Sequence, residues 1–218
     1  MTKLQSKKSK KSTIELLSKI TEGKDYRISK RGEPFVNLTI DGVTHTYLIE
    51  SRQFYDWLQN EMFRLYRIIP SMNDVRSIVA NLIARIRLNK CPENELHKRV
   101  AEYDGRVFVD LCDTDYNVVE ISADGWRTIN NPPVFFVRHE GMRPMPVPVK
   151  GGSVKLICEM LNLENNKDAA LITAFCVYSF RNIGPFPILV INGPKGSAKS
   201  TTSEVIVALV DPNEDCLL

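Results

Sequence analysis

The sequence predicts an α+β module with a hairpin, helices and a small antiparallel sheet, followed by the beginning of an α/β domain. Three observations predict this fold class. Two Asp-Gly pairs, Asp41-Gly42 and Asp104-Gly105, separate apolar runs, as two-residue hairpin turns do. Apolar residues recur at helical spacing between residues 51 and 89. Near the end, the β-branched run 188–191, expected to form a buried parallel strand, leads into a loop rich in Gly, Lys and Ser, and a helical pattern follows.

The first part of the module is expected to combine helices with one hairpin. The expected elements are a helix over 13–20, strands over 35–40 and 43–49, and helices over 51–68 and 73–89. Pro70 separates the last two helices because a proline cannot continue a helix. The polar side of the helix expected over 73–89 carries Arg76, Arg85 and Arg87. We interpret that side as a solvated face and leave contact with a nucleic-acid backbone open as the alternative.

From about residue 95 the pattern changes to short strands. They are expected over 96–103, 106–112, 117–121, 126–129 and 134–137, and together they predict a small twisted antiparallel sheet. Four aspartates, Asp104, Asp110, Asp113 and Asp115, follow no metal-binding spacing, so we interpret them as turn residues. The accessory domain is assigned to residues 13–140, and the Pro- and Gly-rich segment 141–152 is predicted to be an extended linker.

The positive charge of the chain lies in its first residues. The formal net charge is +3, from 29 basic and 26 acidic residues. Five lysines fall within the first eleven residues, and without them 24 basic residues face 26 acidic ones. Residues 1–12 are therefore predicted to form a basic, disordered tail. The tail either contacts nucleic-acid phosphates or only aids solubility, and both readings stay open.

Cysteine and histidine spacing gives no metal or disulfide framework. The five cysteines form no C-x-x-C pair, and the three histidines stand apart. Reduced thiols and a cytoplasmic location are expected. No apolar run of membrane-spanning length occurs, so a membrane is not expected among the partners.

The residues that carry chemistry lie in one short segment. They are Gly193, Pro194, Lys195, Gly196, Ser197, Ala198, Lys199, Ser200 and Thr201. The segment nearly matches G-x-x-x-x-G-K-[ST], the Walker A phosphate loop, with alanine in place of the last glycine. The pattern places backbone N–H groups around phosphate oxygens and a lysine near the β- and γ-phosphates. The predicted ligands are ATP and Mg²⁺, with the Ser200 hydroxyl as a ligand of the metal ion.

The departure at Ala198 has two readings. Alanine costs on the order of 1 kcal/mol relative to glycine if the position needs a positive φ, and almost nothing if φ is negative. Helices are expected over 153–161 and 167–180 before the loop, and over 199–210 after it. Asp211-Pro212 is expected to end the last helix. Residues 153–218 are assigned to an incomplete P-loop NTPase domain.

Several blocks of the chain resemble a known family. The blocks are Val109–Leu111, Val119–Trp126, Pro132–Phe136, Met145–Pro148, and Gly184–Val190 leading into Gly196–Thr202. They resemble bacterial and phage mobile-element ATPases related to the primase-associated, superfamily-3-like AAA+ helicases. The similarity runs from about residue 97 to 211 and is weaker over 42–89. In that family the Gly-Ser-Ala-Lys-Ser form of the loop is usual.

The resemblance implies an accessory module followed by an AAA+-like motor that acts on DNA. Of the family's functional positions, Gly193, Gly196, Lys199, Ser200 and Thr201 map onto this chain. No counterpart of the Walker B acid, the sensor or the arginine finger is found. The chain is therefore expected to be an N-terminal portion, truncated just after Walker A, that binds ATP without turning it over alone.

Two questions about partners stay open at this stage. The full-length form is considered as a homo-oligomer, and DNA is considered as a partner. The alternative to the ATP-binding portion of a helicase-like ATPase is a non-catalytic module of a mobile element. Such a module would bind nucleic acid or a partner protein through the accessory domain.

Overall fold

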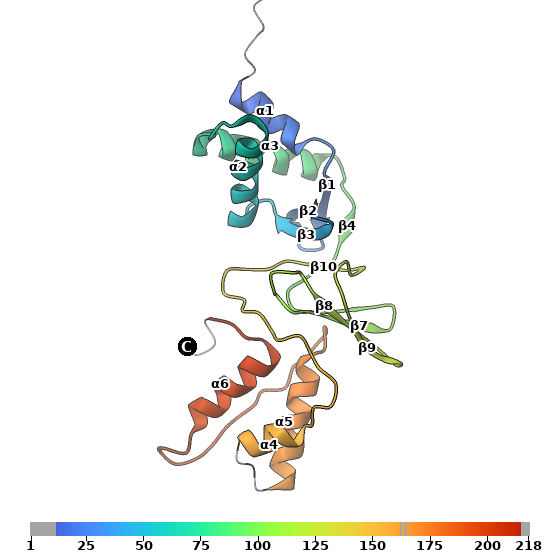
Figure 1. Cartoon of the computed structure of the whole chain (residues 1–218), viewed down its shortest axis with the longest axis vertical. Helices are drawn as coiled ribbons and strands as arrows, with labels where there is room; N and C mark the ends of the chain where they lie inside the picture. The colour runs from blue at the N-terminus through green and yellow to red at the C-terminus, as the bar shows by residue number, and fades with distance from the viewer. Residues whose placement is uncertain (1–11, 162, 164, 215–218) are drawn as a thin grey trace, which may run out of the picture. The chain divides into compact units, whose positions relative to one another are not determined.

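A computed structural model describes residues 12–161, 163 and 165–214 (Figure 1). The contacts divide the chain into two compact units. Unit 1 takes in the described residues up to 40 and residues 45–95, and unit 2 takes in residues 41–44 and the described residues from 96 onward. The predicted basic tail lies outside the described residues, apart from Ser12.

Unit 1 contains three helices among its described residues, each introduced by a serine. Its elements are α1 (Thr13–Thr21), β1 (Asp25–Ser29), β2 (Pro34–Ile40), β3 (Val43–Leu48), α2 (Arg52–Tyr66), α3 (Met72–Leu88) and β4 (Glu93–Asn94). The side chains of Ser12, Ser51 and Ser71 each accept a hydrogen bond from a backbone N–H of the first helical turn. Such caps satisfy N–H groups that a helix leaves without an internal partner. The expected helices and the hairpin are confirmed.

The sheet of unit 1 has the order β3-β2-β1-β4. β1 pairs with β2 antiparallel and with β4 parallel. The sequence analysis did not predict β1, because Asp25 and Arg27 interrupt its apolar residues. In the structure these two side chains form an ion pair at 2.9 Å, and the Arg27 guanidinium also donates to Asn94 of β4. Polar contacts within β1 and across to β4 therefore help to hold a strand that lacks an apolar pattern.

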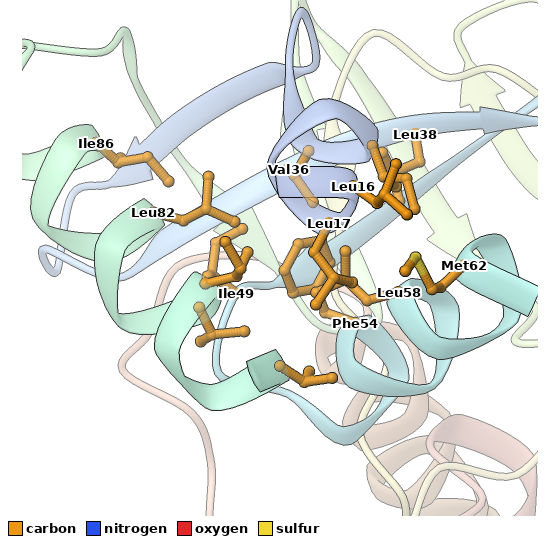
Figure 2. Close-up of a cluster of buried hydrophobic side chains, with 14 residues drawn as sticks. Leu16, Leu17, Val36, Leu38, Ile49, Phe54, Leu58, Met62, Leu82 and Ile86 are labelled. Carbon is orange, nitrogen blue, oxygen red and sulfur yellow. The ribbon is translucent and has the colours of Figure 1, made fainter. Parts of the chain in front are cut away.

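The core of unit 1 is formed where α1, α2 and α3 cover one face of this sheet (Figure 2). Phe54, Leu58 and Met62 follow one another at a spacing of four residues, and all three are fully buried. They meet Leu17 of α1 and Ile49, which directly follows β3 (Figure 2). Each such side chain contributes about 1.5–3 kcal/mol through burial.

Unit 2 begins with short strands and ends with three helices. Its elements are β5 (Leu96–His97), β6 (Val100–Tyr103), β7 (Arg106–Asp110), β8 (Val118–Ser122), β9 (Gly125–Ile129), β10 (Phe135–Phe136), α4 (Lys155–Met160), α5 (Asn166–Ser179) and α6 (Lys199–Val210). Strands β6 to β9 form an antiparallel meander, and β5 pairs parallel with β10. The strand expected over 96–103 is thus divided, because its first two residues pair with a different partner from its last four.

The segment expected to be a linker lies within unit 2, and its beginning is hydrogen-bonded to other parts of that unit. The Arg143 N–H donates to the Pro212 carbonyl at 2.9 Å, and the Glu214 N–H donates to the Gly141 carbonyl at 2.9 Å. The Met145 N–H donates to the Leu111 carbonyl at 2.8 Å. Residues 141–145 therefore join the sheet to the chain that follows α6. The contacts divide the chain at residue 95, so the predicted domain boundaries at 140 and 153 stay a prediction.

A buried carboxylate is paired with two arginines on this meander. Glu120 of β8 accepts from Arg106 at 2.6 Å and from Arg127 at 2.5 Å. The hydrogen bond from Arg127, and then that from Arg106, hold the pKa of the Glu120 carboxyl below its ordinary value. The bonds thus favour the charged form of the carboxyl in the folded protein.

We expect Glu120 to make the stability of unit 2 sensitive to acid. A carboxyl whose pKa is lowered by folding stabilises the protein above its unfolded pKa, about 4.3, and loses this contribution as the pH falls through the folded pKa. Urea unfolding at neutral and acidic pH should therefore show a smaller pH dependence for Glu120→Gln than for the unchanged protein. An equal pH dependence for the two proteins would contradict this assignment.

We expect Leu58→Ala to destabilise unit 1 by about 2–5 kcal/mol, because it leaves a cavity in a fully buried position. The chain has two tryptophans, and Trp57 lies in unit 1. In a Trp126→Phe background, fluorescence during urea unfolding reports on unit 1 alone. The matched control is Leu88→Ala, whose side chain is 80% exposed and whose loss should change the unfolding free energy by less than about 0.5 kcal/mol.

Candidate functional site

The candidate phosphate loop lies between an extended apolar segment and the helix α6. Leu189 and Ile191 pack against a cluster formed by Ile172, Cys176 and Ile206 of α5 and α6. Ile188 and Val190 alternate with them and are exposed. This alternation is the period-two pattern of an extended chain with one covered face.

The prediction of a buried parallel strand over 188–191 is not met among the described residues. No strand is assigned there, and no backbone hydrogen bond joins residues 185–192 to another described residue. The physical reason is that a strand is defined by ladder bonds to a neighbour, which an apolar run cannot supply alone. The segment thus has strand-like exposure without strand pairing.

The loop backbone turns through two residues of left-handed conformation. Gly196 has φ +84° and Ala198 has φ +56°. Ala198 is the N-cap residue of α6 and makes no side-chain cap bond. The position therefore needs a positive φ, which decides between the two readings of alanine: here it carries a cost on the order of 1 kcal/mol.

Gly193 lies close to the side chain of Ser197. A Cβ atom built there would lie 2.5 Å from the Ser197 hydroxyl oxygen and 3.3 Å from its Cβ, so the serine side chain would have to turn away. Since the two residues are four apart, the loop closes on itself at this point. Gly193 has no positive φ, so the glycine here serves close approach within the loop.

Lys199 folds back over the loop. Its ammonium group donates to the carbonyl oxygens of Gly193 at 2.9 Å and Pro194 at 2.7 Å, and to the Ser197 hydroxyl at 3.3 Å. The loop therefore already holds a positive charge at its centre. Such a charge, close to backbone turns of this kind, is the arrangement that anions prefer.

Ser200 and Thr201 lie in the first turn of α6. The first hydrogen bond of this helix runs from the Thr202 N–H to the Ala198 carbonyl at 2.9 Å. The N–H groups of Lys199, Ser200 and Thr201 precede it and have no partner within the helix. Ser200 is exposed, as are Pro194, Lys195 and Gly196, so an anion can reach this side of the loop.

The far end of α6 is tied to the sheet by a buried arginine that the sequence analysis did not single out. The Arg99 guanidinium, 5% exposed, donates to the Asp211 carboxylate at 3.0 Å. It also donates to the carbonyl oxygens of Asp110, Arg143 and Pro212 at 3.1–3.2 Å. No sequence signal marks these residues as neighbours, because they are up to 113 positions apart.

Asp110 is also paired differently from the expectation. It is 1% exposed and accepts two hydrogen bonds from Arg138, at 2.9 and 2.6 Å. It is therefore the buried half of an ion pair, and it also accepts from the Cys112 N–H at 3.1 Å, the contact expected of a turn aspartate. Asp113 does act as a turn residue, accepting from the Asn117 N–H at 2.8 Å.

No metal-binding cluster of three or more His, Cys, Asp or Glu side chains occurs within the described ranges. The four cysteines within those ranges are free, and Cys216 lies outside them. As far as residues 12–214 are described, no helix has both the length and the apolar character for crossing a membrane.

The chain matches no family model, and no curated protein or solved structure is significantly similar to it. No similar protein therefore adds information on what the loop binds, and its function is inferred from its own residues.

We expect Ala198→Gly to stabilise unit 2 by up to about 1 kcal/mol, because glycine adopts a φ of +56° without the steric cost that alanine bears. The same substitution at Ala208, an exposed position inside α6, should destabilise it by about 1 kcal/mol. Thermal unfolding of both variants checks the opposite signs. If both variants lower the melting temperature equally, alanine at position 198 carries no steric cost from its positive φ.

Proposed function

We propose that residues 193–201 bind the phosphates of ATP together with Mg²⁺. One observation carries the proposal: the ammonium group of Lys199 is held at the centre of its own loop by two carbonyl oxygens. In the ligand-bound protein, phosphate oxygens would replace these carbonyls as the partners of the ammonium group. A charge-assisted contact of that kind is about twice as strong as one between neutral groups.

The remaining loop residues fit the same ligand. The left-handed turn at Gly196 and Ala198 and the unpartnered N–H groups at the start of α6 favour an anion there. Ser200, with an exposed hydroxyl, would be the protein ligand of Mg²⁺. The rest of the loop around the phosphates would be formed by Pro194, Lys195, Ser197 and Thr201. When bound, Mg²⁺ would neutralise part of the phosphate charge.

We further propose that the loop belongs to the ATP-binding portion of a DNA helicase-like ATPase of the AAA+, superfamily-3-like kind. The order of the blocks quoted from the sequence supports this class. ATP binding is the proposed activity of this chain. DNA and self-association of a longer form belong to the same proposal.

A non-catalytic binding module is the second candidate, and it is favoured by the separate core of unit 1. That unit has its own sheet, three helices and a buried cluster within its described part. Its contacts with a partner would not need the nucleotide loop. Binding of DNA that survives the loss of ATP binding would support this candidate.

We expect Lys199→Ala to weaken Mg²⁺-dependent ATP binding by roughly tenfold to hundredfold, the worth of one charge-assisted hydrogen bond. Isothermal titration with a non-hydrolysable ATP analogue measures the change. Lys167→Ala is the matched control, because this lysine is exposed at the start of α5, another helix of unit 2. Equal affinity of Lys199→Ala and the control would remove the nucleotide assignment.

Ser200→Ala separates the metal from the phosphates. We expect it to weaken binding in the presence of Mg²⁺ and to leave the weaker binding in the presence of a chelator unchanged. The reason is that the hydroxyl is proposed to contact the metal ion alone. A loss of the same size with and without Mg²⁺ would assign the hydroxyl to the phosphates instead.

A further inference from the structure

Unit 1 exposes a group of large apolar side chains where α2 ends and α3 begins. The group, named here the α2–α3 corner, consists of Phe63, Leu65, Tyr66, Ile68, Ile69 and Met72. Their exposed fractions run from 37% to 79%, the highest at Ile69. They fall within ten consecutive residues, so the chain itself keeps them close together.

The area of this corner is at the upper end of the apolar patches that soluble monomers expose. Six side chains of roughly 200 Å² each, about half exposed, offer on the order of 600 Å². Contiguous apolar surface above a few hundred Å² marks interaction sites in soluble proteins. One side of a standard protein–protein interface covers about 800 Å². The corner therefore has nearly the size that a specific protein contact needs.

The packing of α2 explains why these side chains are outside. Phe54, Leu58 and Met62 already fill the inward face of the helix and are fully buried. Phe63 lies about 100° around the helix from Met62, and Tyr66 lies in the last turn of α2, beyond the last buried residue of that helix. None of the corner side chains belongs to the buried cluster of unit 1.

The charges around the corner indicate the partner. Arg67 lies over the Phe63 ring at 5.2 Å, and Arg76 lies one turn beyond Met72 on α3. Among the described residues neither arginine has an acidic partner within ion-pair distance, whereas Arg64 is paired with Glu61 at 2.7 Å. Asp74, the remaining acid beside the corner, accepts from the Ser71 hydroxyl.

We propose that the α2–α3 corner docks a protein segment that presents large apolar side chains flanked by carboxylates. Tyr, Phe, Met and Arg are the residue types enriched at such contacts. Arg67 and Arg76 would meet the carboxylates of the segment at the rim, and Ile69 and Phe63 would be buried at the centre. A second copy of this chain fits less well, because it would bring the same unpaired arginines face to face.

Two synthetic amphipathic peptides test the proposal with the full chain. Both carry leucine on one face; one has glutamate on both flanks, and the other has lysine in every glutamate position. Fluorescence anisotropy should show that the glutamate peptide binds about tenfold more tightly or better. Equal affinities, or binding of neither peptide, would overturn the proposal.

Variants locate the contact. Ile69→Asp should abolish binding of the glutamate peptide while the fluorescence of Trp57 keeps its folded value. Arg76→Glu should weaken binding roughly threefold or more. Arg87→Glu is the matched control, since it makes the same charge change at the other end of α3 and should have no effect. An equal loss for both arginine variants would mean that the attraction is general and that the corner is not the site.

Two competing occupants are outcomes of the same test. Sedimentation that shows a dimer, lost in Ile69→Asp, would assign the corner to self-association. Binding to vesicles that contain anionic lipid, also lost in Ile69→Asp and without binding of the glutamate peptide, would assign it to a membrane surface. Either result overturns the proposed acidic protein segment.

Discussion

The buried guanidinium of Arg99 is the contact on which the arrangement of unit 2 depends. It joins the end of α6, the segment that precedes α4 and the end of β7 in the meander through one side chain. A buried arginine is tolerated only when its donors are satisfied, and here they meet one carboxylate and three carbonyl oxygens. Removing any of these acceptors would leave a charged donor unpaired in the interior. The helix that begins at the candidate phosphate loop is therefore fixed at its other end by the sheet.

The sequence was sufficient for elements that depend on local rules. The helices α1, α2 and α3 follow from apolar spacing and from Ser12, Ser51 and Ser71 as caps. The hairpins at Asp41-Gly42 and Asp104-Gly105 follow from residues that tolerate a positive φ. The loop at 193–198 and the helix that follows it were likewise predicted from local residue types and apolar spacing.

Features that depend on distant residues were not predictable. β1 exists because β2 and β4 pair with it, and its own sequence is mostly polar. The ion pair of Asp110 with Arg138 was not predicted, because the two residues lie 28 positions apart. The run at 188–191 was predicted to be a buried parallel strand, but two of its side chains are exposed and pairing requires a neighbour that no local pattern can specify. At the candidate site the residue types were predictable, whereas the fold of Lys199 onto its own loop was not.

The alternation at 186–191 has a consequence for the behaviour of the protein at high concentration. Ile188 and Val190 point away from α5 and α6, and the amide groups of this ribbon are without ladder bonds to described residues. Exposed extended segments of this kind pair with one another between molecules through backbone hydrogen bonds. Pro185 and Pro187 limit this tendency, since neither ring nitrogen carries a hydrogen for such a ladder. The two prolines ahead of the candidate phosphate loop are therefore expected to reduce aggregation of the protein through this segment.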